Sequence, residues 1–390
     1  MSAPVTDQGE GRLTMRHAGL TAHVTTAHRA NDNRIFRKEC VSLAQAGVDV
    51  TLVAVADKSE EIDGVRLHAL RRRGSRLSRM VLGPIDAWGA LREVRPDVVH
   101  VHDPELIPLA VLWKWAHKAR FVFDAHEDLG KQVMGKPYIP ARLRPVVRAF
   151  ARGLERLAER QADLIIAATP SIARIFPHAR VVLVQNFPWL RDFPEPTPLA
   201  ADSKTAVYVG NIAESRGALE MLEAIKVATS APRLILAGPV SSQGLESRLR
   251  GAGGDVDYRG VLPASEVPEI VSAGAVGMVL FHPLPNNLEA QPTKIFEYMA
   301  AERPFICSDF PFWRQLVGAF DCGVFVDPED PGAIAEALDG LLTDHDRALR
   351  MGKNGRRAVV EHFVFETEAA RLAEATRELL SLQARREHGR

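Results

Sequence analysis

Short apolar runs alternate with longer amphipathic stretches along the whole chain. In the first half, the apolar runs predict seven strands, and helix-sized segments separate most of them. The expected helices include Arg34–Ala46, Pro104–Lys118 and Ala141–Gln161. Buried β-branched strands separated by helices indicate a parallel sheet that is covered on both faces. The expected strands are His23–Thr26, Val48–Ala54, Val65–Ala69, Val98–His102, Phe121–Asp124, Leu164–Ala168 and Val181–Gln185.

A proline-rich segment, Asn186–Ala201, interrupts this pattern, and proline both removes an amide donor and stiffens the chain. We therefore expect an inter-domain linker over residues 191–201. The alternation then restarts, and the sequence predicts an α/β chain of two tandem Rossmann-like, doubly wound domains over residues 1–190 and 202–365, with a ligand cleft between them. Residues 366–390 form a C-terminal helix that can pack back on the first domain. The second set of expected strands is Thr205–Gly210, Leu234–Ala237, Val256–Arg259, Val276–Leu280, Phe305–Ser308 and Val324–Val326.

Composition places the chain among ordinary globular proteins. Of its 390 residues, 46% are hydrophobic and 25% are charged, which suits two cores and argues against disorder. No apolar run reaches the roughly 20 residues that a membrane-spanning helix needs, and the first residues lack the apolar core of a signal peptide. The three cysteines are far apart and in no metal-ligand spacing. We expect a cytoplasmic protein with reduced thiols.

The net charge of zero is divided unevenly between the two halves. Residues 1–190 hold 28 basic and 20 acidic side chains (28 − 20 = +8), so 21 basic and 29 acidic ones remain (21 − 29 = −8). Arginines recur along one expected helix, where Glu155 and Glu159 could pair with them. This helix face is either simply solvated or in contact with anionic lipid at the inner face of the membrane, and no motif supports nucleic-acid binding. The arginines are Arg142, Arg144, Arg148, Arg152, Arg156 and Arg160.

Two glutamates frame the most informative stretch, NNLEAQPTKIFEYMAAERPFICSD, which spans residues 286–309. Seven residues separate Glu289 from Glu297, and Pro292 is suited to the first turn of a helix that starts between them. Free amides at a helix start can bind phosphate, and carboxylates accept strong hydrogen bonds from sugar hydroxyls. The stretch can therefore hold a diphosphate between two hydroxyl-bearing groups. The alternative is a pair of surface glutamates that merely flank a helix.

This pattern resembles the signature of retaining glycosyltransferase family 4, the group 1 glycosyltransferases of GT-B fold. The resemblance implies that Glu289 holds the donor sugar and that Glu297 holds the nucleotide ribose. It also implies a UDP- or GDP-type nucleotide-sugar as donor. The diphosphate-binding segment is then Gln291, Pro292, Thr293 and Lys294.

A second match is the stretch YVGNIAESRG, residues 208–217, where Arg216 fills the place of a basic residue that pairs with the donor phosphates in the family. Gly210 and Asn211 belong to the same expected donor site. The family commonly has a further arginine where this chain has Asn211, so phosphate binding is either weaker here or moves in part to another residue such as Lys294. By the same resemblance, Val261 and Leu262 line the base pocket.

Two polar clusters, HVHDPEL and FVFDAHED, follow expected neighbouring strands and resemble one branch of the same family, as does the stretch that begins DNRIFRKE. The resemblance implies that His126 approaches the reacting carbon of the donor sugar. An Asp32–Arg34 ion pair that fixes its own loop is an equally open reading. A separate alternative is that the histidines only pack at the strand ends. The acceptor-side candidates are Asp32, Asn33, Arg34, His102, Asp103, Glu127 and Asp128.

These observations predict a retaining glycosyltransferase that needs neither a metal nor a cofactor. Its catalytic residues would be His126, Glu289 and Arg216, and the leaving diphosphate would be stabilised electrostatically. The acceptor stays open among an envelope polysaccharide, a lipid-linked intermediate and a natural product. Three alternatives are a GT-B nucleotide-sugar epimerase, a metal-dependent hydrolase that uses the His and Asp clusters, and a scaffold that binds donor without turning it over.

Overall fold

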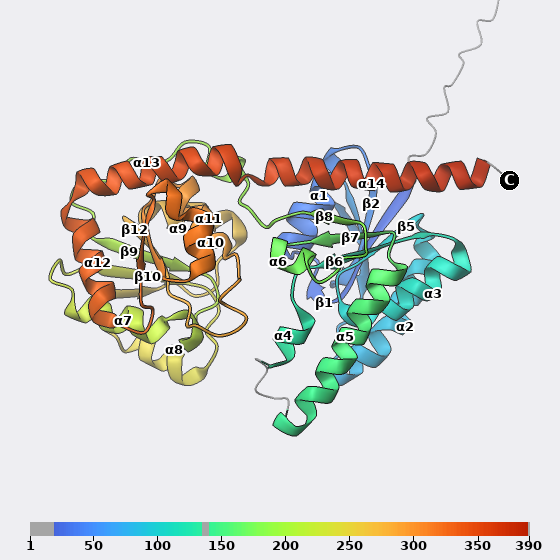
Figure 1. Ribbon diagram of the computed structural model, residues 1–390, viewed down its shortest axis with the longest axis horizontal. Helices are drawn as coiled ribbons and strands as arrows, with labels where there is room; N and C mark the ends of the chain where they lie inside the picture. The colour runs from blue at the N-terminus through green and yellow to red at the C-terminus, as the bar shows by residue number, and fades with distance from the viewer. Residues whose placement is uncertain (1–18, 135–139, 389–390) are drawn as a thin grey trace, which may run out of the picture.

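The computed structural model describes residues 19–134 and 140–388, which form two α/β bodies next to each other (Figure 1). The first is built on an eight-stranded sheet with the order β3-β4-β2-β1-β5-β6-β7-β8. Its strands pair in parallel except β3 with β4. The strand order reverses beside β1, as in doubly wound sheets. The strands are β1 Leu20–Arg29, β2 Asp49–Val55, β3 Glu60–Ile62, β4 Val65–Leu70, β5 Val98–Val101, β6 Arg120–Ala125, β7 Leu164–Ala167 and β8 Val181–Leu183.

The second body is built on a six-stranded sheet with the order β11-β10-β9-β12-β13-β14. All of its strand pairs are parallel. Two doubly wound α/β units in tandem are the predicted fold class, which the structure confirms. The strands are β9 Thr205–Val209, β10 Arg233–Ala237, β11 Val256–Tyr258, β12 Val276–Val279, β13 Phe305–Ser308 and β14 Gly323–Val326.

Helices connect the strands and cover the sheets (Figure 1). In the first body they are the π-helix η1 Asn33–Cys40, α1 Val41–Gln45, α2 Arg76–Val94, the short η2 Pro104–Leu106, α3 Ile107–His117, α4 Leu129–Met134, α5 Arg144–Gln161 and α6 Pro170–Ala173. In the second body and beyond it they are η5 Glu214–Arg216, α7 Ala218–Val227, α8 Gln243–Arg250, α9 Val267–Ala273, α10 Thr293–Ala300, α11 Pro311–Val317, α12 Pro331–Thr343, α13 His345–His362 and α14 Phe365–His388.

Some local details differ from the sequence prediction. Strand β3 was not expected, because its residues are all exposed and carry no apolar alternation. The helix expected from Arg34 begins one residue earlier, as a π-helix whose first amides are capped by the Asp32 carboxylate. Helix α10 begins at Thr293, so Pro292 is its N-cap residue rather than a member of its first turn.

The C-terminal helix α14 leaves the second body and lies across the first, above α1 and β8 in Figure 1. Its Glu368 carboxylate accepts a hydrogen bond from the amide of Gln185 at 3.0 Å, and the Phe365 amide donates to the carbonyl of Pro188 at 2.9 Å. The rings of Trp189 and Phe365 pack edge to face with centroids 4.8 Å apart. The chain therefore crosses between the two bodies twice, and the two crossings contact each other.

Candidate functional site

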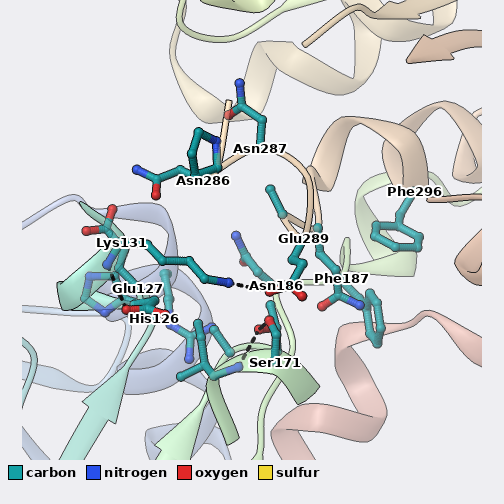
Figure 2. Close-up of a pocket in the computed structure, with 18 of the residues that line it drawn as sticks. His126, Glu127, Lys131, Ser171, Asn186, Phe187, Asn286, Asn287, Glu289 and Phe296 are labelled. Carbon is teal, nitrogen blue, oxygen red and sulfur yellow. Dashed lines mark hydrogen bonds and ion pairs between the residues drawn. The ribbon is translucent and has the colours of Figure 1, made fainter. Parts of the chain in front are cut away.

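A cavity of about 410 Å³ lies between the two bodies, and both contribute to its walls (Figure 2). In parallel sheets the ligand site lies at the carboxyl ends of the strands, and loops that follow β6, β7 and β9 reach this cavity. Its lining residues include Arg34, His126, Glu127, Asp128, Lys131, Thr169, Ser171, Asn186, Arg216, Asn286, Asn287, Glu289, Gln291 and Phe296.

His126 follows β6 and faces the cavity from the first body. Its side chain is 25% exposed, and its Nδ1 lies 3.4 Å from Oδ2 of Asp124 but is not aligned for a hydrogen bond. Burial lowers the pKa of His126, but the Asp124 carboxylate outweighs that effect and leaves the pKa above its ordinary value. A partly charged imidazole beside the cavity can stabilise negative charge or donate a proton there.

Asp124 also holds Arg34, whose Nη2 and Nε donate to its two carboxylate oxygens at 2.8 and 3.2 Å. Arg34 lines the cavity, whereas Asn33 is exposed and borders a smaller cavity beside it. Asp32 does not pair with Arg34 through side chains; it accepts the backbone amides of residues 34 and 35 and contacts His28 at 3.2 Å. The proposed Asp32–Arg34 ion pair is therefore wrong, because Asp32 acts as a helix cap and Asp124 takes the guanidinium.

His102 and Asp103 are not cleft-edge groups, contrary to expectation, since they are only 1% and 2% exposed. The Asp103 carboxylate accepts the amides of Thr26 and Ala27 at 2.6 and 3.0 Å, and so ties the end of β1 in place. His102 Nδ1 lies 3.0 Å from Oδ2 of Asp124. Both residues therefore act on the site only through the backbone and side chains that they hold.

The loop after β6 and the start of α4 supply three further lining residues, of which the sequence pointed to two. Glu127 is exposed, and the Asp128 carboxylate caps the amide of Lys131 at 2.9 Å. Lys131 itself was missed, because no motif marked it. Its Nζ donates to Oε2 of Glu289 at 2.6 Å, so this ion pair spans the cavity (Figure 2). Lys131 holds the pKa of Glu289 below its usual range.

Two cations of the second body lie beside the ring of Phe281, and one of them, Arg216, lines the cavity. Arg216 precedes Gly217, whose φ of 74° is left-handed and whose added Cβ would meet the carbonyl of Leu280. The Arg216 guanidinium lies 3.8 Å from the centroid of the Phe281 ring, and Lys294 Nζ lies 5.9 Å from that centroid. Burial lowers the pKa of Arg216 and lowers that of Lys294 to about 8. Among the described residues, neither cation has a carboxylate within ion-pairing distance.

The other expected donor residues lie around these cations. Gly210 has a φ of 134°, and a Cβ at this position would clash with the Lys294 side chain. Asn211 is exposed, and its backbone carbonyl accepts a hydrogen bond from the Tyr208 hydroxyl at 2.7 Å. Glu297 faces the smaller cavity beside Lys38, and burial raises its pKa. The remaining expected positions are Gln291, which lines the main cavity, Pro292 and Thr293 at the start of α10, and Val261 and Leu262 after β11.

The His and Asp clusters of the first body do not form an open metal site in the described part of the chain. Asp103 is committed to the end of β1, whereas His126 faces the cavity. The group that could hold a metal ion is instead a fully buried one: His23, Glu39, His100 and His102.

Two family models match the chain one after the other. The model of the glycosyl transferase 4-like domain matches residues 33–186, and the model of glycosyl transferases group 1 matches residues 191–358. The chain belongs to the group 1 glycosyltransferases. Together the two matches cover most of both bodies.

Two curated relatives share parts of this sequence. TuaC of Bacillus subtilis, named for teichuronic acid biosynthesis, is 29% identical over 36% of this chain and 33% of its own length. The alpha-D-kanosaminyltransferase of Streptomyces kanamyceticus is 26% identical over 46% of each chain. The matched region thus spans only a third to a half of these relatives.

Solved structures show the same GT-B fold over nearly the whole chain. Sucrose-phosphate synthase from Thermosynechococcus elongatus aligns with a TM-score of 0.76 at 20% identity, covering 93% of this chain and 100% of that one. HepE of Anabaena, in complex with UDP and glucose, aligns with a TM-score of 0.70 at 13% identity, covering 92% and 99%. None of the helices in the described residues is long and apolar enough to cross a membrane.

Proposed function

We propose that this chain is a retaining glycosyltransferase that transfers a sugar from a nucleoside diphosphate donor to an acceptor without a metal ion at the diphosphate. The observation that carries the proposal is the pair of cations, Arg216 and Lys294, which lie beside one aromatic ring without a carboxylate partner. Partly buried cations that lack a partner are costly unless an anion joins them. A diphosphate would supply the missing charge, and HepE has been crystallised with UDP.

The other groups fit distinct roles around such a donor. Glu289 would accept hydrogen bonds from the sugar hydroxyls, and Lys131 would then give up or share its contact with that carboxylate. His126 would lie beside the reacting carbon, with Asp124 next to its ring and Arg34 holding the Asp124 carboxylate. Arg216 and Lys294 would stabilise the charge that builds up on the leaving diphosphate.

The donor can be tested directly by titrating the protein with UDP and GDP, followed by calorimetry, in buffer that contains a chelator. Binding of either nucleotide at micromolar concentration without divalent metal is the expected result. Loss of binding in Arg216→Ala but not in the exposed Arg250→Ala would place the nucleotide at the cation pair. The proposal is contradicted if neither UDP nor GDP binds, or if binding requires added metal.

Retention and acceptor dependence need a separate measurement. Proton NMR of the products reports the anomeric configuration, and we expect the donor's configuration to be kept. Turnover of nucleotide-sugar without any acceptor would instead indicate an epimerase, and an inverted product would rule out the retaining mechanism. The names of the two relatives refer to teichuronic acid biosynthesis and to kanosaminyl transfer, so envelope polysaccharides and natural products are both acceptor classes to screen.

We further propose that the first body docks on anionic lipid through the N-terminal part of α5 and the neighbouring surface of α2. On α5, Val146 and Phe150 are 67% and 63% exposed on one face, and the exposed Arg142 lies about one turn before Val146. Apolar and cationic side chains on one helix surface favour the interface of an anionic bilayer. Arg152 does not belong to this surface, because it pairs with Glu155. On α2 the exposed apolar side chains are Leu77, Met80, Val81, Leu82 and Ile85.

A further inference from the structure

Three histidines share one face of the first sheet, beneath the cleft. His23 in β1 is the register partner of His100 in β5, and alternate residues of a strand point to the same side, so His102 follows His100 onto that face. The π-helix η1 packs over them and places Glu39 against the three rings. All four side chains are at most 2% exposed.

The polar atoms of this cluster point at one another and find few partners elsewhere. His23 Nδ1 lies 3.0 Å from His102 Nε2, and both His23 Nδ1 and His100 Nε2 lie 3.9 Å from Oε2 of Glu39. In the described structure, His100 Nε2 and both Glu39 oxygens have no hydrogen-bond partner. Arg34 Nε lies 3.1 Å from Oε1 of Glu39 but is not aligned for a hydrogen bond. Buried polar atoms left in this way cost roughly 1–3 kcal/mol each.

We propose that this cluster is a closed, structural site for one divalent transition-metal ion, Zn²⁺ first, with one ligand atom from each of His23, Glu39, His100 and His102. One ligand atom can be taken from each residue so that all four lie within 4.8 Å of one another. Ligand atoms around a tetrahedral zinc ion lie roughly 3.3–3.6 Å apart. The site therefore reaches that geometry through side-chain shifts of less than an ångström or so.

The surroundings match what such an ion requires. Metal-bound histidines usually donate their other ring nitrogen to a carboxylate, and His102 Nδ1 faces Asp124 in this way at 3.0 Å. Burial lowers the pKa of His23 and His100, so both rings are neutral, which is the form that binds metal. Three imidazoles and one carboxylate suit zinc, cobalt or nickel rather than magnesium or calcium.

Binding releases a proton and leaves no open coordination position. Burial raises the pKa of Glu39, which favours a protonated carboxyl in the empty site, and that proton would pass to solvent as the metal–oxygen bond forms. The ion would also replace the hydrogen bond between His23 and His102. Four protein ligands are typical of a structural site, so the ion would join β1, β5 and η1 and take no part in sugar transfer. The proposal is therefore independent of the proposed function.

The test uses the full-length chain with any affinity tag removed. The protein is incubated with Zn²⁺ or Co²⁺, separated from free metal, and analysed for metal content by mass spectrometry, for cobalt absorption in the visible range, and for its melting temperature. We expect one ion per chain, a tetrahedral cobalt spectrum, and a melting temperature that falls with a chelator and recovers with one equivalent of zinc.

Matched variants then locate the ion. His100→Gln and Glu39→Gln should lose the bound metal, whereas the exposed His178→Gln should keep it. If a site variant does not fold, the loss and recovery of the wild-type melting temperature with chelator and zinc still tests the proposal. Metal content below a tenth of an equivalent after loading, with an unchanged melting temperature, overturns it. Equal metal content in wild type and folded site variants also overturns it, because the ion then lies elsewhere.

Discussion

Removing the Arg216 guanidinium is the sharpest test of the donor site. The group is partly buried against the ring of Phe281, and Lys294 is a second cation beside the same ring. A unit charge about 4 Å from a phosphate oxygen contributes about 4 kcal/mol at an effective dielectric constant of 20. Water that enters the space left by alanine, together with the remaining Lys294, recovers part of this energy. We therefore expect Arg216→Ala to lose about 2–3 kcal/mol of transition-state stabilisation.

That loss corresponds to a decrease of about 30- to 150-fold in kcat/KM for the nucleotide-sugar. The assay is the initial rate of nucleoside diphosphate release in the presence of acceptor, with Arg250→Ala as the surface control. Arg216→Lys should recover part of the rate, because it restores the charge without the two-pronged geometry.

Stability should move in the opposite direction from activity. Burial lowers the pKa of Arg216, and no carboxylate in the described residues pairs with it, so its removal should leave the melting temperature unchanged or higher. A rate within twofold of wild type in a folded Arg216→Ala protein would refute the reasoning and move the diphosphate away from this cation. A large drop in melting temperature would instead show that the side chain is structural.

Three more predictions concern other parts of the site and the surface. Glu289→Gln should lower kcat at least tenfold with little loss of UDP or GDP affinity, since the carboxylate faces the sugar rather than the nucleotide; a fall in nucleotide affinity alone would contradict that role. Because the pKa of Lys294 is about 8, its charge is present below that pH and is lost above it, so the KM for donor should rise between pH 7 and 9. Lys294→Arg should flatten this rise, and a pH profile that is the same in both proteins would exclude Lys294 from phosphate binding. A double variant, Val146→Ser with Phe150→Ser, should reduce flotation with vesicles of anionic phospholipid severalfold, whereas Val227→Ser, at a residue of α7 that is 58% exposed, should not. Flotation of the double variant equal to that of Val227→Ser would argue against docking through α5.

The sequence predicted the architecture well because strand and helix periods are local signals. Two doubly wound units follow directly from alternating apolar and amphipathic segments, and most strand bounds lie within a residue or two of expectation. The short strand β3 was missed because it is exposed and borrows its order from pairing with β4. Pro84 interrupts the helical pattern of α2 in the sequence, although the folded chain carries the helix through it.

The site was harder to predict, since it depends on which side of a strand end each group faces. His126 and Arg216 do line the cleft, but the Asp103 carboxylate turns to amides near the end of β1, and no local pattern distinguishes these outcomes. The contact between Lys131 and Glu289 joins residues that are 158 positions apart, so only the relative placement of the two bodies could show it. The cluster around Glu39 likewise depends on the register between β1 and β5.

The double crossing near Phe365 limits how the cleft can open. A body joined to another at a single point can twist freely, but one joined at two points turns most easily about the line through them. Here the segment at Pro188 and the start of α14 are hydrogen-bonded to each other, so the axis of rotation lies where α13 meets α14, along one edge of the molecule (Figure 1). The cleft should therefore open by a hinge motion about this axis, and the ion pair between Lys131 and Glu289, which joins the two walls, should break first. A protein truncated before α14 would keep every residue that lines the cleft, yet it would lose one of the two connections between the bodies.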